Sequence, residues 1–321
     1  MKSMQAVALS APTNGVDIRL TEHIVPSVKP GWVLVRIYAF GLNHSEKILR
    51  LAEINAPYIP KPIIPGIECA GEIADASDTS FGVGEKVIAL MGGMGRSFDG
   101  SYAEYALLPA HHVFTVDTDL QWTQLGAVPE TYFTAWGSLF ECLHLEPKDK
   151  LLVRGGTCAL GYAGIQIAKA LGCEVTATTH WEDKLYLLRE SGVDSAVLDQ
   201  GEIRGKVSGI TKALELVGAK TLRDTLLSVE PGGVVCNTGI LGGQYTLDGF
   251  DPIKEIPNGV YLTGFYSNNP TQKVINDIFN VLHTHNLLPR IGRIYNFTQI
   301  AEASAALDAG KVNGKIVISV V

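Results

Sequence analysis

The sequence predicts an α/β protein with two domains, one small and rich in β-strands and one built around a doubly wound parallel sheet. Up to about residue 120, short apolar or alternating stretches are separated by Gly, Pro and Asn clusters, a pattern typical of a small barrel or sandwich. From Lys150 onward strand and helix patterns alternate, and repeated βα units require a parallel sheet with helices on both faces. A chain of 321 residues is long enough for two such domains.

The first half contains five predicted strands followed by a long helix. The strands cover Gln5–Leu9, Asp17–Thr21, Trp32–Tyr38, Lys86–Leu90 and Tyr102–Leu107. The helical pattern runs over Gln124–Leu143 and is expected to connect the two halves of the chain.

The second half contains six predicted strands and the helices between them. The strands are Lys150–Arg154, Cys173–Thr179, Ser195–Asp199, Lys212–Val217, Gly233–Thr238 and Val260–Phe265. The helices are Gly161–Leu171, Asp183–Ser191 and Thr221–Ser228. The last segment, 290–321, returns to β character and ends in a strand at Lys315–Val320, which we expect to rejoin the N-terminal domain.

Composition argues against several classes of partner. The formal net charge is -7 and no basic run is present, so nucleic-acid binding is not expected. No stretch approaches the roughly 18 uninterrupted apolar residues that suggest a membrane span, and the N-terminus makes no convincing signal peptide. The five cysteines are dispersed without a C-x-x-C pair, which favours reduced thiols. We therefore expect a cytoplasmic protein.

A glycine-rich turn follows the strand Lys150–Arg154 and precedes a helix. In that context backbone N–H groups and the helix N-terminus can face the pyrophosphate of a dinucleotide, and Gly164 would let the helix approach the sheet closely. Cys158 stands where G-x-G-x-x-G has its second glycine, so its side chain either crowds the phosphates or turns aside. The alternative is a βα turn in a flavodoxin-like domain that binds no nucleotide. The predicted cofactor contacts are Gly156, Thr157, Cys158, Ala159, Leu160 and Gly161.

The end of the second strand of this half indicates which cofactor is bound. An Asp or Glu there would bind the ribose 2′-hydroxyl of NAD, but Thr179 occupies the position. Thr178, Thr179 and His180 can donate hydrogen bonds to a 2′-phosphate, and Lys184 can supply positive charge. NADPH is therefore the expected cofactor. Lys184 could instead be an ordinary solvated helix residue, and two acidic neighbours weaken the positive field around it.

Short motifs occur in order along nearly the whole chain. They include Gly41-Leu-Asn-His-Ser-Glu46, Ile64-Pro-Gly-Ile-Glu-Cys-Ala-Gly71, Gly82-Val-Gly-Glu-Lys-Val87, Gly100-Ser-Tyr-Ala-Glu104, Glu230-Pro-Gly-Gly233 and Gly314-Lys-Ile-Val317. Together they resemble the medium-chain dehydrogenase/reductase superfamily, and its zinc-independent quinone oxidoreductase branch in particular. The resemblance implies a GroES-like β-barrel catalytic domain over 1–123 and 287–321. It also implies a Rossmann dinucleotide-binding domain over 124–286, with the nicotinamide in the cleft between the domains.

The resemblance also bears on zinc. Zinc-dependent relatives have a Cys where this chain has Asn43, a His where it has Ile67, and a third ligand near Glu130. A tetrahedral zinc site needs three suitable protein ligands, and only Glu130 could serve. No catalytic metal is therefore expected, nor ordinary alcohol oxidation, which needs a Lewis acid.

By the same resemblance, several residues lie along the cofactor. Asn43 would help hold the nicotinamide ribose, and Thr134 would face the nicotinamide. The other candidates are Gly239, Phe265 or Tyr266, and Lys315.

The implied chemistry is hydride transfer from NADPH to a quinone, or to the β-carbon of an enone, followed by a proton. His44 and Ser45 stand where relatives keep part of a proton relay, and Glu46 is adjacent. Glu130 could donate a proton if burial raises its pKa. The structural alternatives are that Glu46 pairs with Arg50 at i,i+4 and that Glu130 is only a helix-start carboxylate.

Two other functions remain open. An enoyl-thioester reductase would share the cofactor, although the sequence offers no basic cluster for the phosphates of a pantetheine arm. A non-catalytic NADPH-binding protein stays open because the tyrosines that often line the quinone pocket of relatives correspond to Ile48 and Ile54. By analogy with relatives, a homodimer would form through an edge strand at Val260–Phe265.

Overall fold

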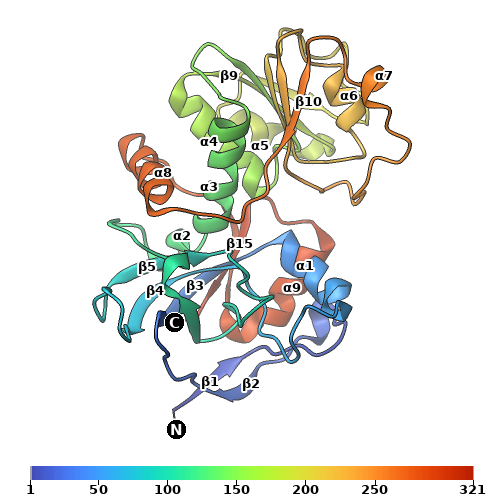
Figure 1. Cartoon of the computed structure of the whole chain (residues 1–321). Coiled ribbons are helices and arrows are strands. Elements are labelled where there is room, and N and C mark those ends of the chain that lie inside the picture. The colour runs from blue at the N-terminus through green and yellow to red at the C-terminus, as the bar shows by residue number, and fades with distance from the viewer. Residues whose placement is uncertain (1, 321) are drawn as a thin grey trace. The chain divides into compact units, whose positions relative to one another are not determined.

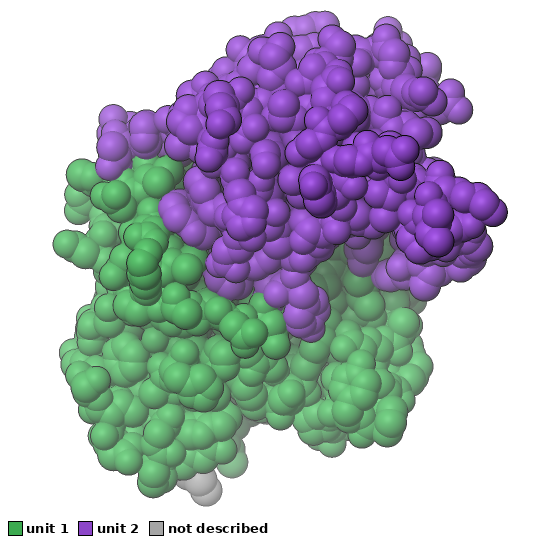
Figure 2. All heavy atoms as spheres, turned by 45° about the horizontal axis from the view of Figure 1, so that its top comes forward, with its two compact units in different colours: residues 1–130, 268–283, 288–321 green, residues 131–267, 284–287 purple. Residues whose placement is uncertain are grey.

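The computed structural model describes residues 2–320, which form two compact units (Figure 1, Figure 2). Unit 1 comprises residues 1–130, 268–283 and 288–321, and unit 2 comprises residues 131–267 and 284–287. The expected domain and segment ends at 1 and 321 lie outside the described residues. The domain boundaries expected at 123/124 and 286/287 stay predictions.

Within the described residues, a six-stranded parallel sheet forms the framework of unit 2, in the order β10-β9-β8-β11-β12-β13. The order reverses between β8 and β11, which places the switch point of a doubly wound sheet beside the carboxyl end of β8. The predicted doubly wound sheet is thereby confirmed, and β13 lies at its edge. The strands are β8 (Lys150–Arg154), β9 (Glu174–Thr179), β10 (Ser195–Leu198), β11 (Lys212–Glu215), β12 (Val234–Asn237) and β13 (Tyr261–Gly264).

The helices of unit 2 connect these strands. Helix α4 packs closely on the sheet, because a Cβ at Gly164 would lie 3.0 Å from Cδ2 of Leu214 in β11. The close approach predicted for Gly164 is confirmed. The helices are α4 (Ala159–Leu171), the 3₁₀ turn η5 (Glu182–Lys184), α5 (Leu185–Glu190), α6 (Leu222–Leu226) and α7 (Pro252–Glu255).

The continuous helix predicted over Gln124–Leu143 is wrong. The structure has α2 (Trp122–Leu125), then α3 (Pro129–Trp136), then a π-helical turn η4 (Gly137–Cys142). Pro129 lacks an N–H for the preceding turn and is well suited to begin a new helix, so the apolar pattern is interrupted there. Short π-helical segments occur frequently at functional sites.

Unit 1, in the part that the structure describes, contains a seven-stranded mixed sheet in the order β14-β15-β3-β4-β5-β7, with β6 also paired to β3. Strand β15 pairs antiparallel with β3, which confirms that the last segment rejoins the N-terminal part of the chain. The strands are β3 (Trp32–Leu42), β4 (Glu68–Asp75), β5 (Lys86–Leu90), β6 (Tyr105–Pro109), β7 (Val113–Thr115), β14 (Ile291–Asn296) and β15 (Lys315–Ser319). A separate pair consists of β1 (Ser3–Ala6) and β2 (Thr21–Ile24).

The sequence patterns missed several elements of unit 1. The strand predicted at Asp17–Thr21 is wrong, since Gly15–Asp17 is a 3₁₀ turn and β2 begins only at Thr21. Strand β4 was not predicted because Gly71 and its acidic residues interrupt the apolar alternation. The other elements are α1 (His44–Leu51), η2 (Glu53–Asn55), η3 (Ala110–His112), α8 (Gln272–Thr284), η6 (Phe297–Gln299) and α9 (Ile300–Ala309).

A buried ion network ties β8 to its neighbours in unit 2. The side chain of Arg154 is fully buried, and its guanidinium binds the carboxylate of Asp199 in a bidentate manner at 2.8 and 3.0 Å. Its Nη1 also donates to Asp224 at 2.7 Å. Each charged group therefore needs its partners, because an unpaired buried ion lowers the stability of the folded state.

We expect Arg154→Met to lower the free energy of unfolding by about 3–5 kcal/mol, since Asp199 and Asp224 lose their shared counter-ion. Lys150→Met in the same strand is the matched control. The Lys150–Glu174 pair is about half exposed, so its loss should cost less than about 1 kcal/mol. Urea denaturation of both variants checks this, and equal destabilisation would contradict it.

Candidate functional site

Three neighbouring strands of the sheet in unit 1 bring polar side chains together at one end of the strands. Strand β3 is antiparallel to both β15 and β4, so the end of β3 lies beside the starts of the other two. Asn43 directly follows β3, Glu68 begins β4 and Lys315 begins β15. Residues far apart in the chain, from three motifs, therefore meet at one place.

These side chains form a hydrogen-bonded group. The Nζ of Lys315 donates to Oε1 of Glu68 and to Oδ1 of Asn43, each at 2.6 Å. The Nδ2 of Asn43 donates to the same Glu68 oxygen at 2.8 Å. Glu68 is 0 % exposed and Lys315 is 3 % exposed. With Glu46, described below, these residues are called the buried polar cluster.

The second oxygen of Glu68 faces the beginning of α3. Its Oε2 accepts the backbone N–H of Glu130 at 2.7 Å, in the first turn of that helix. A carboxylate is stabilised at a helix N-terminus, where unpaired N–H groups and the helix dipole meet. Both carboxylate oxygens of Glu68 thus accept hydrogen bonds, Oε1 from Lys315 and Asn43 and Oε2 from the backbone of Glu130.

Gly41 is the residue that permits this packing. A Cβ at position 41 would lie 2.2 Å from Cε of Lys315 and 2.5 Å from Oε1 of Glu68. Any larger residue would push the ion pair apart, so glycine is needed at this close approach.

Glu46 lies in the first turn of α1 and is fully buried. Its carboxylate accepts the backbone N–H of Asn43, which caps the helix, and the backbone N–H of Ile67 at 3.1 Å. Burial raises the pKa of Glu46 to about 7, although the charge of Lys315 and the two backbone hydrogen bonds act in the opposite direction. Glu46 can therefore hold or release a proton near neutral pH.

The alternative in which Glu46 pairs with Arg50 is wrong. The guanidinium of Arg50 instead binds Asp308 at 2.5 Å and the carbonyl of Thr13 at 2.7 Å. The Glu46 side chain turns back to satisfy backbone donors at the start of α1, which places it away from the next helical turn.

The other predicted proton-relay residues lie on the same helix. The Oγ of Ser45 accepts a hydrogen bond from Arg96 at 2.9 Å, and Arg96 also pairs with Glu53. His44 is partly buried, and burial lowers the pKa of its imidazole. Their part in proton transfer stays a prediction, as does that of the Glu130 side chain.

In unit 2 the glycine turn joins β8 to α4 beside the switch point. The Cys158 side chain turns aside to cap α4, and its Sγ accepts the N–H of Gly161 at 3.3 Å. Burial raises the pKa of this thiol, which keeps it protonated. Two backbone groups of the turn, the N–H of Gly155 and of Gly156, donate to Thr178 at 3.1 and 2.8 Å.

The residues expected near a 2′-phosphate differ in their placement. Thr178 is buried and its hydroxyl also lies 3.4 Å from Asp199, so this side chain positions the turn. The Thr179 hydroxyl is 3.3 Å from that of Thr157. His180 is exposed, and Lys184 is half-buried with its ammonium 5.5 Å from the ring centre of Trp181. Direct contact of these residues with a cofactor stays a prediction.

Of the residues expected along the cofactor, Thr134 lies in α3 and Phe265 lies against η4, both in unit 2. The Ser138 hydroxyl donates to the carbonyl of Thr134 at 2.7 Å and lies 2.9 Å from the Thr238 hydroxyl, which precedes Gly239. The ring of Phe265 packs against Phe133, with ring centres 5.8 Å apart. Tyr266 is 82 % exposed, so of the two aromatic candidates Phe265 is the one that is packed in place.

Sequence reasoning missed Glu68 and Ser138. Glu68 lies beside Ile67 in a motif that was recognised, and its ionisable side chain could have been singled out there. Ser138 carries no comparable pattern, because only the fold brings it to Thr238.

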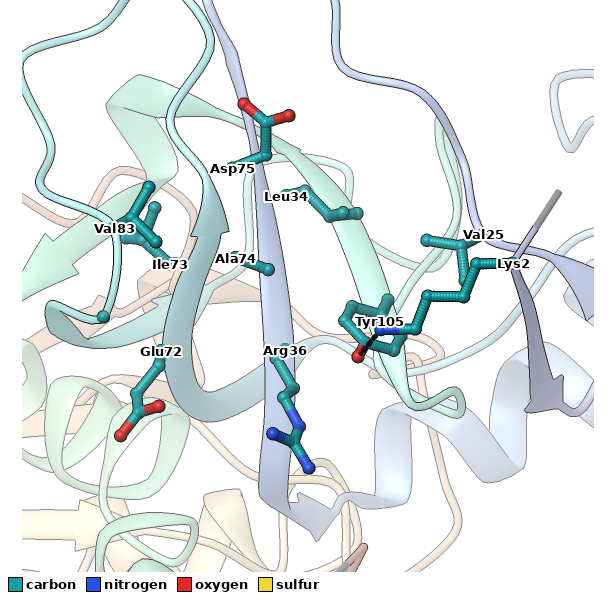
Figure 3. A pocket seen from close by; sticks show the side chains of 11 residues that line it. Lys2, Val25, Leu34, Arg36, Glu72, Ile73, Ala74, Asp75, Val83 and Tyr105 are labelled. Atoms are coloured by element: carbon teal, nitrogen blue, oxygen red, sulfur yellow. Dashed lines mark hydrogen bonds between the residues drawn. The ribbon is translucent and has the colours of Figure 1, made fainter.

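A separate pocket of about 400 Å³ lies on another part of the sheet in unit 1 (Figure 3). Its lining combines opposite charges, the basic side chains of Lys2 and Arg36 and the acidic side chains of Glu72 and Asp75. It contains none of the predicted site residues.

Among residues 2–320, no group of three or more His, Cys, Asp or Glu side chains is placed to hold a metal ion. Across the same residues, every helix is too short or too polar to cross a bilayer.

Two family models match this chain. One, described as alcohol dehydrogenase GroES-like domain, matches residues 29–118, and the other, described as zinc-binding dehydrogenase, matches residues 159–283. Quinone oxidoreductase from Pongo abelii is 26% identical over 312 residues, covering 92% of this chain and 91% of the relative. Alcohol dehydrogenase from Geobacillus stearothermophilus is 26% identical over 346 residues, covering 98% of each chain. A mycobacterial protein solved with NADPH is 22% identical, with a TM-score of 0.87 and coverage of 98% and 99%.

We expect Glu46 to make folding stability pH-dependent. Because its pKa is about 7 in the folded state and about 4.5 otherwise, its contribution is present below pH 4.5 and is lost as the pH rises through 7. The loss amounts to up to about 3 kcal/mol, and Glu46→Gln should remove it. Urea unfolding at a series of pH values checks this.

Glu53→Gln is the control for that measurement. Burial of Glu53 is outweighed by hydrogen bonds from Arg96, which lower its pKa, so its contribution is lost as the pH falls. An unchanged pH dependence in the Glu46 variant would refute the assignment of the raised pKa.

Proposed function

Because the chain belongs to the medium-chain dehydrogenase/reductase superfamily, in its quinone oxidoreductase-like branch, we propose that it reduces a quinone or an α,β-unsaturated carbonyl compound with NADPH and without zinc. Its fold combines a GroES-like domain with a Rossmann domain, as expected. Membership supports an NAD(P)-dependent oxidoreductase, and the buried polar cluster supports the more specific reaction.

Asn43 and Ile67 are poorly suited to bind zinc. The Asn43 amide oxygen already accepts a hydrogen bond from the Lys315 ammonium, and the hydrocarbon side chain of Ile67 offers no ligand atom. Two of the three positions that bind zinc in relatives thus lack a suitable donor. The ammonium of Lys315 also supplies positive charge to the carboxylates that would otherwise attract a cation.

The chain's own residues account for the rest of the reaction. NADPH would supply the hydride, and the turn before α4 fits its pyrophosphate because a helix of 13 residues begins there at the switch point. Glu46 can hold the proton that must follow the hydride, since its pKa lies near 7. Quinones and enones are electrophilic, so positioning contributes most of the rate and no Lewis acid is needed.

The preference for NADPH rests on the end of β9. Thr179 stands where an acid would repel a 2′-phosphate, and Lys184 lies one short turn away. The mycobacterial relative in fold was solved with NADPH, which agrees with this choice. A cytoplasmic homodimer joined through the edge strand β13 completes the proposal.

We expect the purified protein to oxidise NADPH in the presence of a quinone or an enone, measured as loss of nicotinamide absorbance. Dialysis against EDTA should leave the rate unchanged, because no step uses a metal. Activity that is lost on chelation and restored by zinc would overturn the zinc-independent mechanism. Reduction confined to thioesters would favour an enoyl-thioester reductase, and no turnover at all would favour a non-catalytic NADPH-binding protein.

We expect Lys184→Ala to weaken NADPH binding about tenfold or more and to leave NADH binding nearly unchanged, since only NADPH carries the 2′-phosphate. Lys148→Ala is the control, because Lys148 is exposed and precedes β8 at the opposite end of the strands. Titration calorimetry with both nucleotides measures this. An equal loss for the two nucleotides would show that Lys184 does not recognise the 2′-phosphate.

A further inference from the structure

We propose that Lys315 is a positioning residue, whose ammonium fixes the orientation of the Asn43 amide and serves as the counter-charge of two buried carboxylates. The inference deepens the proposed function and rests on it only for the effect on turnover. The structural part concerns unit 1 alone and can be tested without a substrate.

The orientation of the Asn43 amide follows from its two closest charged partners, Lys315 and Glu68; Nδ2 also lies 3.4 Å from Oε1 of Glu46 and 3.5 Å from the carbonyl of Gly41, both acceptors. The ends of an amide are nearly identical in shape, so hydrogen-bond partners decide which end faces where. An ammonium only donates, so Lys315 requires the oxygen, and a carboxylate only accepts, so Glu68 requires the NH₂ group. The reverse orientation would set NH₂ against the ammonium and oxygen against the carboxylate. Asn43 is therefore held in one state as long as both partners are charged.

The buried polar cluster contains more negative than positive charge when all its groups are ionised. Glu46 and Glu68 are fully buried; Lys315 pairs directly with Glu68, and its charge also acts on Glu46. Two buried carboxylates with one ammonium leave an uncompensated negative charge, which is costly in a protein interior. Binding one proton makes the cluster neutral.

The hydrogen bonds decide which carboxylate takes that proton. Both Glu68 oxygens already accept from Lys315, from the Asn43 amide and from the Glu130 backbone N–H. Glu46 accepts the backbone N–H groups of Asn43 and Ile67 and a long hydrogen bond from Nδ2 of Asn43 at 3.4 Å, but no hydrogen bond from an ammonium. Its pKa is raised first by burial and also by the charge of Glu68, while Lys315 lowers it, so Glu46 is the group that takes the proton. The buried hydroxyl of Tyr102 also faces Glu46, and Tyr102 in turn lies near the charges of Arg50 and Asp308. Lys315 thus keeps Glu46 in a range where it can both hold and release a proton.

Lys315→Met is the informative variant. Loss of a close opposite charge should raise the pKa of Glu46 by about 1–3 units. The pH at which Glu46-linked stability is lost should therefore move upward by that amount, and so should the limb of kcat/KM against pH that Glu46 controls. Lys315→Arg keeps the charge and should retain most of the wild-type profile. Lys311→Met, an exposed residue just before β15, is the control and should leave both profiles unchanged.

The double variant Lys315→Met/Glu68→Gln covers the case in which the single variant does not fold. It removes one charge of each sign, so it should fold and show a smaller upward shift than Lys315→Met. NADPH affinity is measured in parallel by calorimetry.

The outcomes separate this inference from the proposed function. An upward shift in the unfolding profile supports the role of Lys315 even if the wild-type protein reduces no substrate, a result that would overturn the proposed function alone. Unchanged pH profiles in Lys315→Met, or in the double variant, overturn the inference. Loss of NADPH affinity with unchanged pH profiles would also overturn it, because Lys315 would then be a nucleotide ligand.

Discussion

The antiparallel pairing of β15 with β3 is the constraint on which the candidate site depends. This pairing carries Lys315, near the end of the chain, to within hydrogen-bonding distance of Asn43. The pairing of β3 with β4 adds Glu68 from the other side. Each of these ions would be costly alone in the interior, and each is stable because the sheet supplies the others. The hydrogen bond from Glu130 then links the same carboxylate to the start of α3.

In unit 2, too, hydrogen bonds between buried polar groups hold the candidate site in place. The turn after β8 is held by backbone hydrogen bonds to Thr178 and by the thiol of Cys158, and Arg154 anchors the strand below it through Asp199. Thr178 contacts both the turn and Asp199, so the turn and the buried ion network form one connected structure. A thiol in place of a glycine is accommodated because it serves as the helix cap.

Polar burial gives the two units different chemical properties. In unit 2 the guanidinium of Arg154 donates hydrogen bonds to the carboxylates of Asp199 and Asp224, and this network acts as a fixed support. In the cluster around Lys315, burial raises the pKa of Glu46 and the charge of Glu68 adds to that rise, while Lys315 opposes it. The raised pKa of Glu46 therefore follows from its buried surroundings and not from the residue type alone.

The sequence by itself determined the doubly wound sheet, the glycine turn and the return of the last strand, because periodicity and turn residues act locally. Strands β5 and β8 were predicted with their observed bounds, while the break at Pro129 and the strand β4 were missed. The motifs also placed Asn43, Glu46 and Lys315 among the site candidates. Only the tertiary structure decided that these residues meet, that Glu68 joins them and that Glu46 does not pair with Arg50. Such contacts depend on strand register and on burial, which join residues more than 200 positions apart and leave no local pattern.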